Sequence, residues 1–142
     1  MKGKMIIICL CLLVLTIISV PIIVINMPKR LFSITPDEVT SIQIQSGGTG
    51  KITYITDKIK VYQIVKDVNN FRYKDKHILN EGEFLPPGWL FGIDFYDDSS
   101  NLLLRFSLIS NTYISFNNDI YYLMPNEKID YDYFINLTHI TQ

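Results

Sequence analysis

The chain divides into an apolar N-terminal segment and a longer segment of mixed polarity. Residues 6–25 are almost purely aliphatic and carry no charge. A helix of this length, with a rise of ~1.5 Å per residue, spans about 30 Å, the thickness of the hydrocarbon core of a bilayer. A cleaved signal peptide has a shorter apolar stretch and small residues at its cleavage site, where this chain has Ile, Val and Pro. The pattern predicts an uncleaved transmembrane signal-anchor over residues 1–27.

Beyond a predicted linker over residues 28–37, apolar and polar residues alternate in short runs. A period of two indicates strands that bury one face. The glycines of residues 47–50 supply the positive φ that the turn of the first hairpin needs. Short polar turns between the later runs indicate antiparallel pairing. The expected strands cover residues 39–45, 51–56, 71–76, 89–96, 102–109, 112–116 and 120–124.

Two segments break this alternation and predict helices. In the first, apolar side chains recur every third residue after Asp57, an aspartate suited to cap a helix. Its expected core-facing positions are Ile59, Tyr62, Val65 and Val68. The second is a short C-terminal helix over residues 130–137, with Tyr133, Phe134 and Leu137 expected to face the core.

Together these elements predict an α+β fold. We expect an N-terminal transmembrane helix, then a small antiparallel sheet of five to seven strands with one main helix packed on one face and a short C-terminal helix. The folded part covers residues 38–142, which is the size of one domain and leaves no room for a second.

Charge and cysteine usage narrow the class of protein. All 14 acidic residues follow position 33, but only nine of the 13 basic residues do, so this part has a formal charge of −5. The surplus of acid argues against nucleic acid as a partner. Cys9 and Cys11, the only cysteines, both lie in the apolar segment, so the domain is expected to hold together without a disulfide.

The orientation in the membrane follows from the ends of the apolar segment. Lys2 and Lys4 precede it and Lys29 and Arg30 follow it, so the positive charges on its two sides balance. A very short N-terminal head before a long apolar run is typical of a signal-anchor, and long domains translocate largely regardless of charge. We therefore expect the C-terminal domain to lie outside the cell.

Motifs for catalysis are sparse. His77 and His139 are the only histidines, neither adjoins a plausible nucleophile, and glycines 47–50 lead into a strand rather than the helix that a phosphate site requires. Asp94, Asp97 and Asp98 supply oxygen ligands of the kind that calcium prefers, but their spacing lacks the calcium-loop pattern, and a polar turn accounts for them. We assign no catalytic residue, cofactor or metal.

The aromatic residues are the more informative group. Seventeen of the 18 follow position 33, and on one strand Trp89, Phe91 and Phe95 share a face while Tyr96 points to the other. One set is expected to fill the core, and packing in the core is the simpler account of the other set as well. The alternative is a contact surface, because tyrosine and tryptophan bury much area with few rotatable bonds. The residues of this expected contact surface are Trp89, Tyr96, Tyr113, Tyr121 and Tyr122.

Several strand and turn patterns resemble a group of small extracytoplasmic proteins of Gram-positive bacteria, which are lipoproteins or single-pass membrane proteins. The patterns are Val39-x-Ser-Ile-x-Ile44, the glycine turn with Lys51, Ile55-Thr-Asp57 opening a helix, Ile93-Asp-Phe-Tyr-Asp97 and Ile120-Tyr-Tyr122. The likeness covers residues 37–137, but the chain lacks a cysteine suited to lipid modification. The resemblance implies a location and a fold, and it implies no reaction and no active-site residue.

The leading hypothesis is a single-pass membrane protein, held in the membrane by Ile6 to Ile25, whose outer domain binds an envelope protein or a cell-wall component without catalysis. One alternative is a small envelope hydrolase that uses carboxylates, with Glu81 or Glu83 acting beside Asp94. Another is a structural subunit of a membrane complex, whose membrane helix pairs with a second helix.

Overall fold

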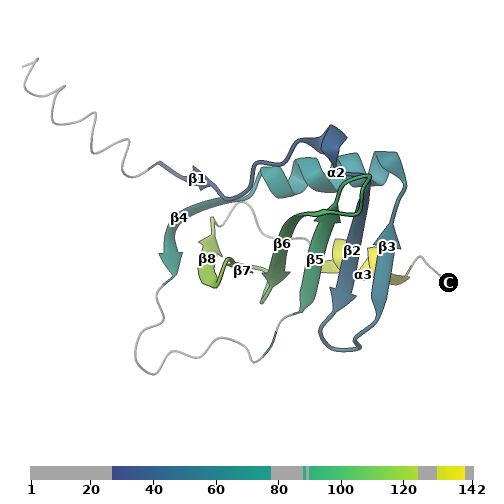
Figure 1. The fold of residues 1–142 in the computed structure, drawn as a ribbon. Helices are drawn as coiled ribbons and strands as arrows, with labels where there is room; N and C mark the ends of the chain where they lie inside the picture. The colour runs from purple at the N-terminus through teal and green to yellow at the C-terminus, as the bar shows by residue number, and fades with distance from the viewer. Residues whose placement is uncertain (1–26, 78–87, 89, 125–130, 140–142) are drawn as a thin grey trace, which may run out of the picture.

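The computed structural model of the chain describes residues 27–77, 88, 90–124 and 131–139 (Figure 1). The fold is α+β, as predicted, with one antiparallel sheet, a main helix and a short C-terminal helix. Its elements in chain order are β1 (Lys29–Arg30), the 3₁₀ turn η1 (Pro36–Glu38), β2 (Ser41–Ser46), β3 (Ile52–Ile55), α2 (Lys58–Asn69), β4 (Arg72–His77), β5 (Phe91–Tyr96), β6 (Leu102–Leu108), β7 (Tyr113–Phe116), β8 (Asp119–Leu123) and α3 (Tyr131–His139).

The sheet has eight strands in the order β1-β4-β8-β7-β6-β5-β2-β3, and every neighbouring pair is antiparallel. The expectation of five to seven strands is therefore wrong. The additional strand is β1, which has only two residues and no alternation that a sequence pattern could reveal. Residues 6–25 lie outside the described residues, and none of the helices in the described part has the length and apolar character of a membrane span.

Part of the segment expected to be a linker contacts the sheet and its core. Lys29 and Arg30 pair with β4, and the backbone N–H of Leu31 donates to the carbonyl of Phe71 over 2.9 Å. Phe32 is only 3% exposed, and its ring stacks on that of Phe106 with 4.7 Å between the centroids. The chain is thus fixed to the sheet from Lys29 onward.

The core lies on one face of the sheet, beneath both helices (Figure 1). Alternate residues of the central strands point to this face, as the period of two predicted. On the helical side, the ring of Phe134 from α3 lies 6.2 Å from that of Phe91 in β5. The fully buried side chains of the core include Ile42, Ile44, Ile64, Ile93, Phe95, Phe106 and Ile114.

Helix α2 begins where predicted, because the side chain of Asp57 accepts a hydrogen bond of 2.9 Å from the backbone N–H of Lys60. Its buried face differs from the predicted one, since Ile59 and Tyr62 are 71% and 51% exposed. A strict step of three drifts around a helix of 3.6 residues per turn, so a straight face needs alternating steps of three and four. The buried residues, Val61, Ile64, Val65 and Val68, follow that rule.

Candidate functional site

The face of the sheet opposite the core, here called the outer face, is polar and aromatic. Both described helices pack on the core side, so within the described ranges no helix covers the outer face. The strand register places side chains from four strands in one row. A second row beside it has small or amide residues at its centre and Ile52 and Ile120 at its two ends. The first row is Tyr54, Gln43, Asp94 and Arg105, and the second includes Gln45, Gly92, Ser107 and Ser115.

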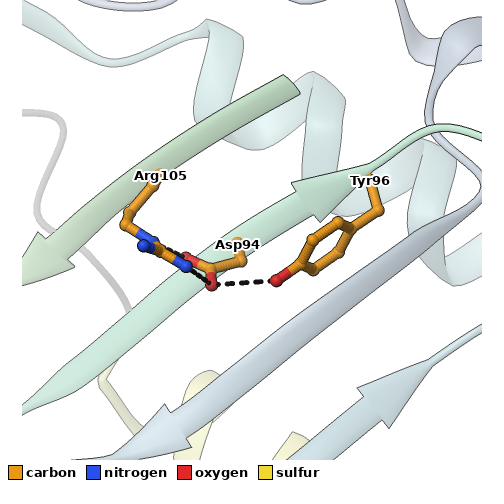
Figure 2. Close-up of polar contacts among 3 residues, drawn as sticks. All are labelled: Asp94, Tyr96 and Arg105. Carbon is orange, nitrogen blue, oxygen red and sulfur yellow. Dashed lines mark hydrogen bonds and ion pairs between the residues drawn. The ribbon is translucent and has the colours of Figure 1, made fainter. Parts of the chain in front are cut away.

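Asp94, Tyr96 and Arg105 form a polar cluster at the middle of this face (Figure 2). Arg105 donates through Nε to Oδ1 of Asp94 over 2.8 Å and through Nη2 to Oδ2 over 2.6 Å. Tyr96 donates through its hydroxyl to the same Oδ2 over 3.1 Å. Asp94 is only 7% exposed although it stands on the solvent side of the sheet, because Arg105 lies across it.

The residues of the cluster differ in solvent exposure, and this difference determines the chemistry that is open to them. The Arg105 side chain is 64% exposed, and the hydrogen bonds and charge of Asp94 raise its pKa. Both carboxylate oxygens of Asp94 already accept hydrogen bonds, which makes this carboxylate a poor general base. Glu81 and Glu83, the other carboxylates of the hydrolase alternative, lie outside the described residues. The cluster therefore presents a fixed guanidinium to solvent.

A second cluster with the same pattern, an Asp-x-Tyr sequence and a cation from the adjacent strand, joins β4 to β8. Lys76 forms an ion pair with Asp119, whose Oδ2 also accepts a hydrogen bond of 3.4 Å from the Tyr121 hydroxyl. The Lys76 ammonium stands 6.0 Å from the centre of the Tyr121 ring. The hydrogen bond to Asp119 raises the pKa of Lys76. This pair provides a natural comparison for the Asp94–Arg105 pair.

The tyrosines of the expected contact surface are divided between the two faces. Tyr113 and Tyr122 are paired across β7 and β8 on the outer face, with ring centroids 5.3 Å apart, and Tyr96 shares that face. Tyr121 is only 6% exposed and points to the core side, so its inclusion in a contact surface is corrected: neighbouring strand residues must face opposite ways. Trp89 lies outside the described residues.

The turn between β5 and β6 is stabilised by hydrogen bonds within the turn. Asp97 accepts hydrogen bonds from the backbone N–H groups of Ser99 and Asn101, over 2.9 and 2.7 Å, and from the Asn101 side chain over 2.9 Å. The hydrogen bonds from Asn101 and Ser99 lower the pKa of Asp97. Asp97 thus stabilises the turn, whereas Asp94, which was also considered for calcium, pairs with Arg105 on the outer face. In the described part of the chain, no group of three His, Cys, Asp or Glu side chains could hold a metal ion.

A groove of about 640 Å³ runs beside β6. It exists because β6 is longer than β7: the two strands pair only at Ser107 and Leu108, and the chain then turns back at Asn117 and Asn118. Both asparagines have positive φ, 51° and 65°, as a tight two-residue hairpin turn requires. The lining residues are Leu102, Leu103, Leu104, Arg105, Phe106, Ser107, Ser115, Phe116, Asn117 and Asn118.

The raised pKa values of two tyrosines predict how the stability of the domain changes at alkaline pH. Burial raises the pKa of Tyr96 and of Tyr121 above the ordinary value of 10.0, so the folded state holds these protons more tightly than the unfolded state. The resulting stabilisation is complete below pH 10 and is lost as the pH rises through the folded pKa values. In unfolding titrations above that pH, we expect the native chain to lose more stability than the variant Tyr96→Phe/Tyr121→Phe. Equal losses would assign the alkaline transition to other groups.

Arg105 is the residue that sequence reasoning missed. Counting back from the pair Tyr96 and Leu102 would place Leu104 opposite Asp94. A register shift between Phe95 and Tyr96 moves Arg105 into that position, and no pattern in the sequence marks this shift. Such a cross-strand pair of opposite charges is a recognised stabilising unit of sheets.

Comparison of the chain with protein-family models, curated proteins and solved structures finds no match.

Proposed function

We propose that this chain is a membrane-anchored, extracytoplasmic binding domain that contacts its partner through the outer face of the sheet. Residues 6–25 serve as the anchor, and the partner is an envelope protein or a cell-wall component. The domain acts by binding and not by catalysis.

The single observation that supports this proposal best is the outer face itself. Tyr113 and Tyr122 form an aromatic pair at one side of it and Tyr54 is exposed at the other, with the Arg105 guanidinium between them. Aromatic and arginine side chains are enriched in binding sites because they bury a large area and make directed hydrogen bonds. A sheet face of this composition is suited to recognition.

The proposal is tested by photo-crosslinking in intact cells that produce the full chain. A benzophenone amino acid at Tyr122, on the outer face, is expected to give a covalent adduct with an envelope component. The matched control is the same replacement at Tyr62, a tyrosine exposed on α2. No adduct is expected there, because α2 packs on the core side of the sheet.

Two results would contradict the proposal. One is adduct formation at Tyr62 that equals or exceeds that at Tyr122, which would move the contact to the helical side. The other is a domain that resists protease added to intact cells and becomes sensitive only on lysis, which would place it inside the cell.

A further inference from the structure

The groove beside β6 has a feature that ordinary surface clefts lack, an unpaired strand edge. β6 extends from Leu102 to Leu108, and β7 pairs with only its last two residues. Within the described ranges, no strand pairs with the stretch from Leu102 to Phe106 on the side away from β5. This open edge lies in the interior of the sheet order, between β5 and the β7–β8 hairpin, and not at either end of the sheet.

The backbone groups at this edge point into the groove. The N–H of Ile109 donates to the carbonyl of Tyr113, the first residue of β7, over 2.9 Å. Alternate residues of an antiparallel strand direct their N–H and C=O groups to the same side, so Ser107 and Arg105 face the same way as Ile109. Ser107 meets Ser115 of β7, whereas Arg105 lies beyond the last pair of the β6–β7 ladder. Among the described residues, no strand pairs with the backbone of Arg105 on this side, so it can accept a main-chain partner there.

The side chains around this edge differ on the two faces of the sheet. On the core side, Leu104 and Phe106 are buried and Phe116 is partly buried, so that side of the groove is apolar. On the outer side stands Arg105, the only charged residue among the described residues that line the groove. Its Nε and Nη2 are bonded to Asp94, and most of the guanidinium is exposed.

We propose that the groove binds an extended segment of the partner protein, which adds to β6 as a short strand and presents an acidic side chain to Arg105. This inference rests on the proposed binding function and names the class of partner. A residue opposite Arg105 would exchange two backbone hydrogen bonds with it and share its face of the sheet. Its two neighbours would point to Leu104, Phe106 and Phe116. The geometry thus specifies the pattern apolar–acidic–apolar.

Charge complementarity favours an acidic extended peptide over the other possible occupants of the groove. A neutral polysaccharide would leave the exposed backbone groups of Arg105 without matched partners and would not use the exposed part of its guanidinium, which Asp94 contacts only through Nε and Nη2. A basic peptide would bring a like charge next to this guanidinium. Directly opposed residues of opposite charge stabilise a pair of strands, and like charges destabilise it. An acidic residue in an extended peptide satisfies the backbone edge and the guanidinium together.

The test uses the full, ¹⁵N-labelled chain in detergent micelles and three peptides as probes. They are acetyl-Ser-Val-Glu-Val-Ser-amide, the same peptide with Lys in place of Glu, and the Glu peptide methylated on the Glu backbone nitrogen. We expect saturable amide shifts confined to residues 102–107 and 115–118. The Glu peptide is expected to bind about tenfold more tightly than the Lys peptide, and the methylated peptide at least about tenfold more weakly than its parent.

The double variant Asp94→Asn/Arg105→Gln is expected to bind the Glu and Lys peptides alike, since it removes both charges of the groove pair and keeps side chains that can hydrogen-bond. The matched control, Lys76→Gln/Asp119→Asn, neutralises the comparable pair between β4 and β8 and should leave the preference for Glu unchanged. Its folded spectrum also shows whether neutralising such a pair is tolerated.

The inference is overturned if no peptide gives a saturable shift, if the shifts lie outside the groove, or if methylation leaves affinity unchanged. It is also overturned if the preference for Glu survives in the Asp94→Asn/Arg105→Gln variant. These outcomes are separate from those for the proposed function. Crosslinking at Tyr122 without peptide binding would retain the binding function and remove this groove as its site.

Discussion

Replacing Phe32 with alanine is expected to lower the free energy of unfolding by about 3–5 kcal/mol, the range typical of phenylalanine truncation in a core. Phe32 is almost fully buried. Its ring stacks on Phe106 and meets Phe116 edge-on, with 5.1 Å between the latter centroids. Truncation would leave a cavity among rings that come from distant parts of the chain. Denaturant unfolding of the full chain, followed by circular dichroism, measures the loss.

The control for this experiment is Ile59→Ala, which removes an apolar side chain that is largely exposed on α2. Its expected cost is within about 0.5 kcal/mol, as for most surface substitutions. If Phe32→Ala proved equally mild, residues 28–37 would be the linker that the sequence pattern predicted. A large difference would establish that the domain includes them.

Replacing Arg105 with methionine is expected to cost about 2 kcal/mol, because it leaves Asp94 nearly buried without its two charge-assisted hydrogen bonds. This figure lies below the 3–5 kcal/mol of fully buried pairs, since Arg105 itself is largely exposed. The double variant Asp94→Asn/Arg105→Met removes the unpaired charge and should regain about 1 kcal/mol. A double-mutant cycle in denaturant measures this coupling.

Lys76→Met is the matched control for that cycle. Its partner Asp119 is partly exposed, so water can replace the lost ammonium, and the expected loss of stability is smaller than that of Arg105→Met. If the two Asp94 and Arg105 substitutions were simply additive, the pair would contribute no coupling, and the cluster on the outer face would have no role in fixing the register of β5 and β6.

Local patterns were sufficient to predict most of the elements of this fold. The glycines near position 50, the polar turn after Tyr96 and the cap at Asp57 act over a few residues, so the hairpins and the start of α2 can be predicted from neighbouring residues alone. The C-terminal helix was expected over residues 130–137 and is observed at Tyr131–His139, with Phe134 and Leu137 buried.

The predictions that were wrong concern geometry that a sequence pattern does not contain. β1 has two residues, and only its pairing with β4 defines it as a strand. The buried face of α2 is set by where the sheet lies, so Ile59 and Tyr62 could be apolar and still remain exposed. Tyr121 and Tyr122 are adjacent in a strand and cannot share a face, and which of the two is buried is decided by the core beneath β8.

The way in which the chain enters the sheet determines how the domain would respond to mechanical load. A pull on the residues ahead of Lys29 acts first on β1, which is an edge strand of only two residues. Such a pairing offers little resistance, so the force passes directly to the ring of Phe32 inside its aromatic cluster. Under tension we expect this segment to detach in one step, while the sheet from β4 to β3 remains intact.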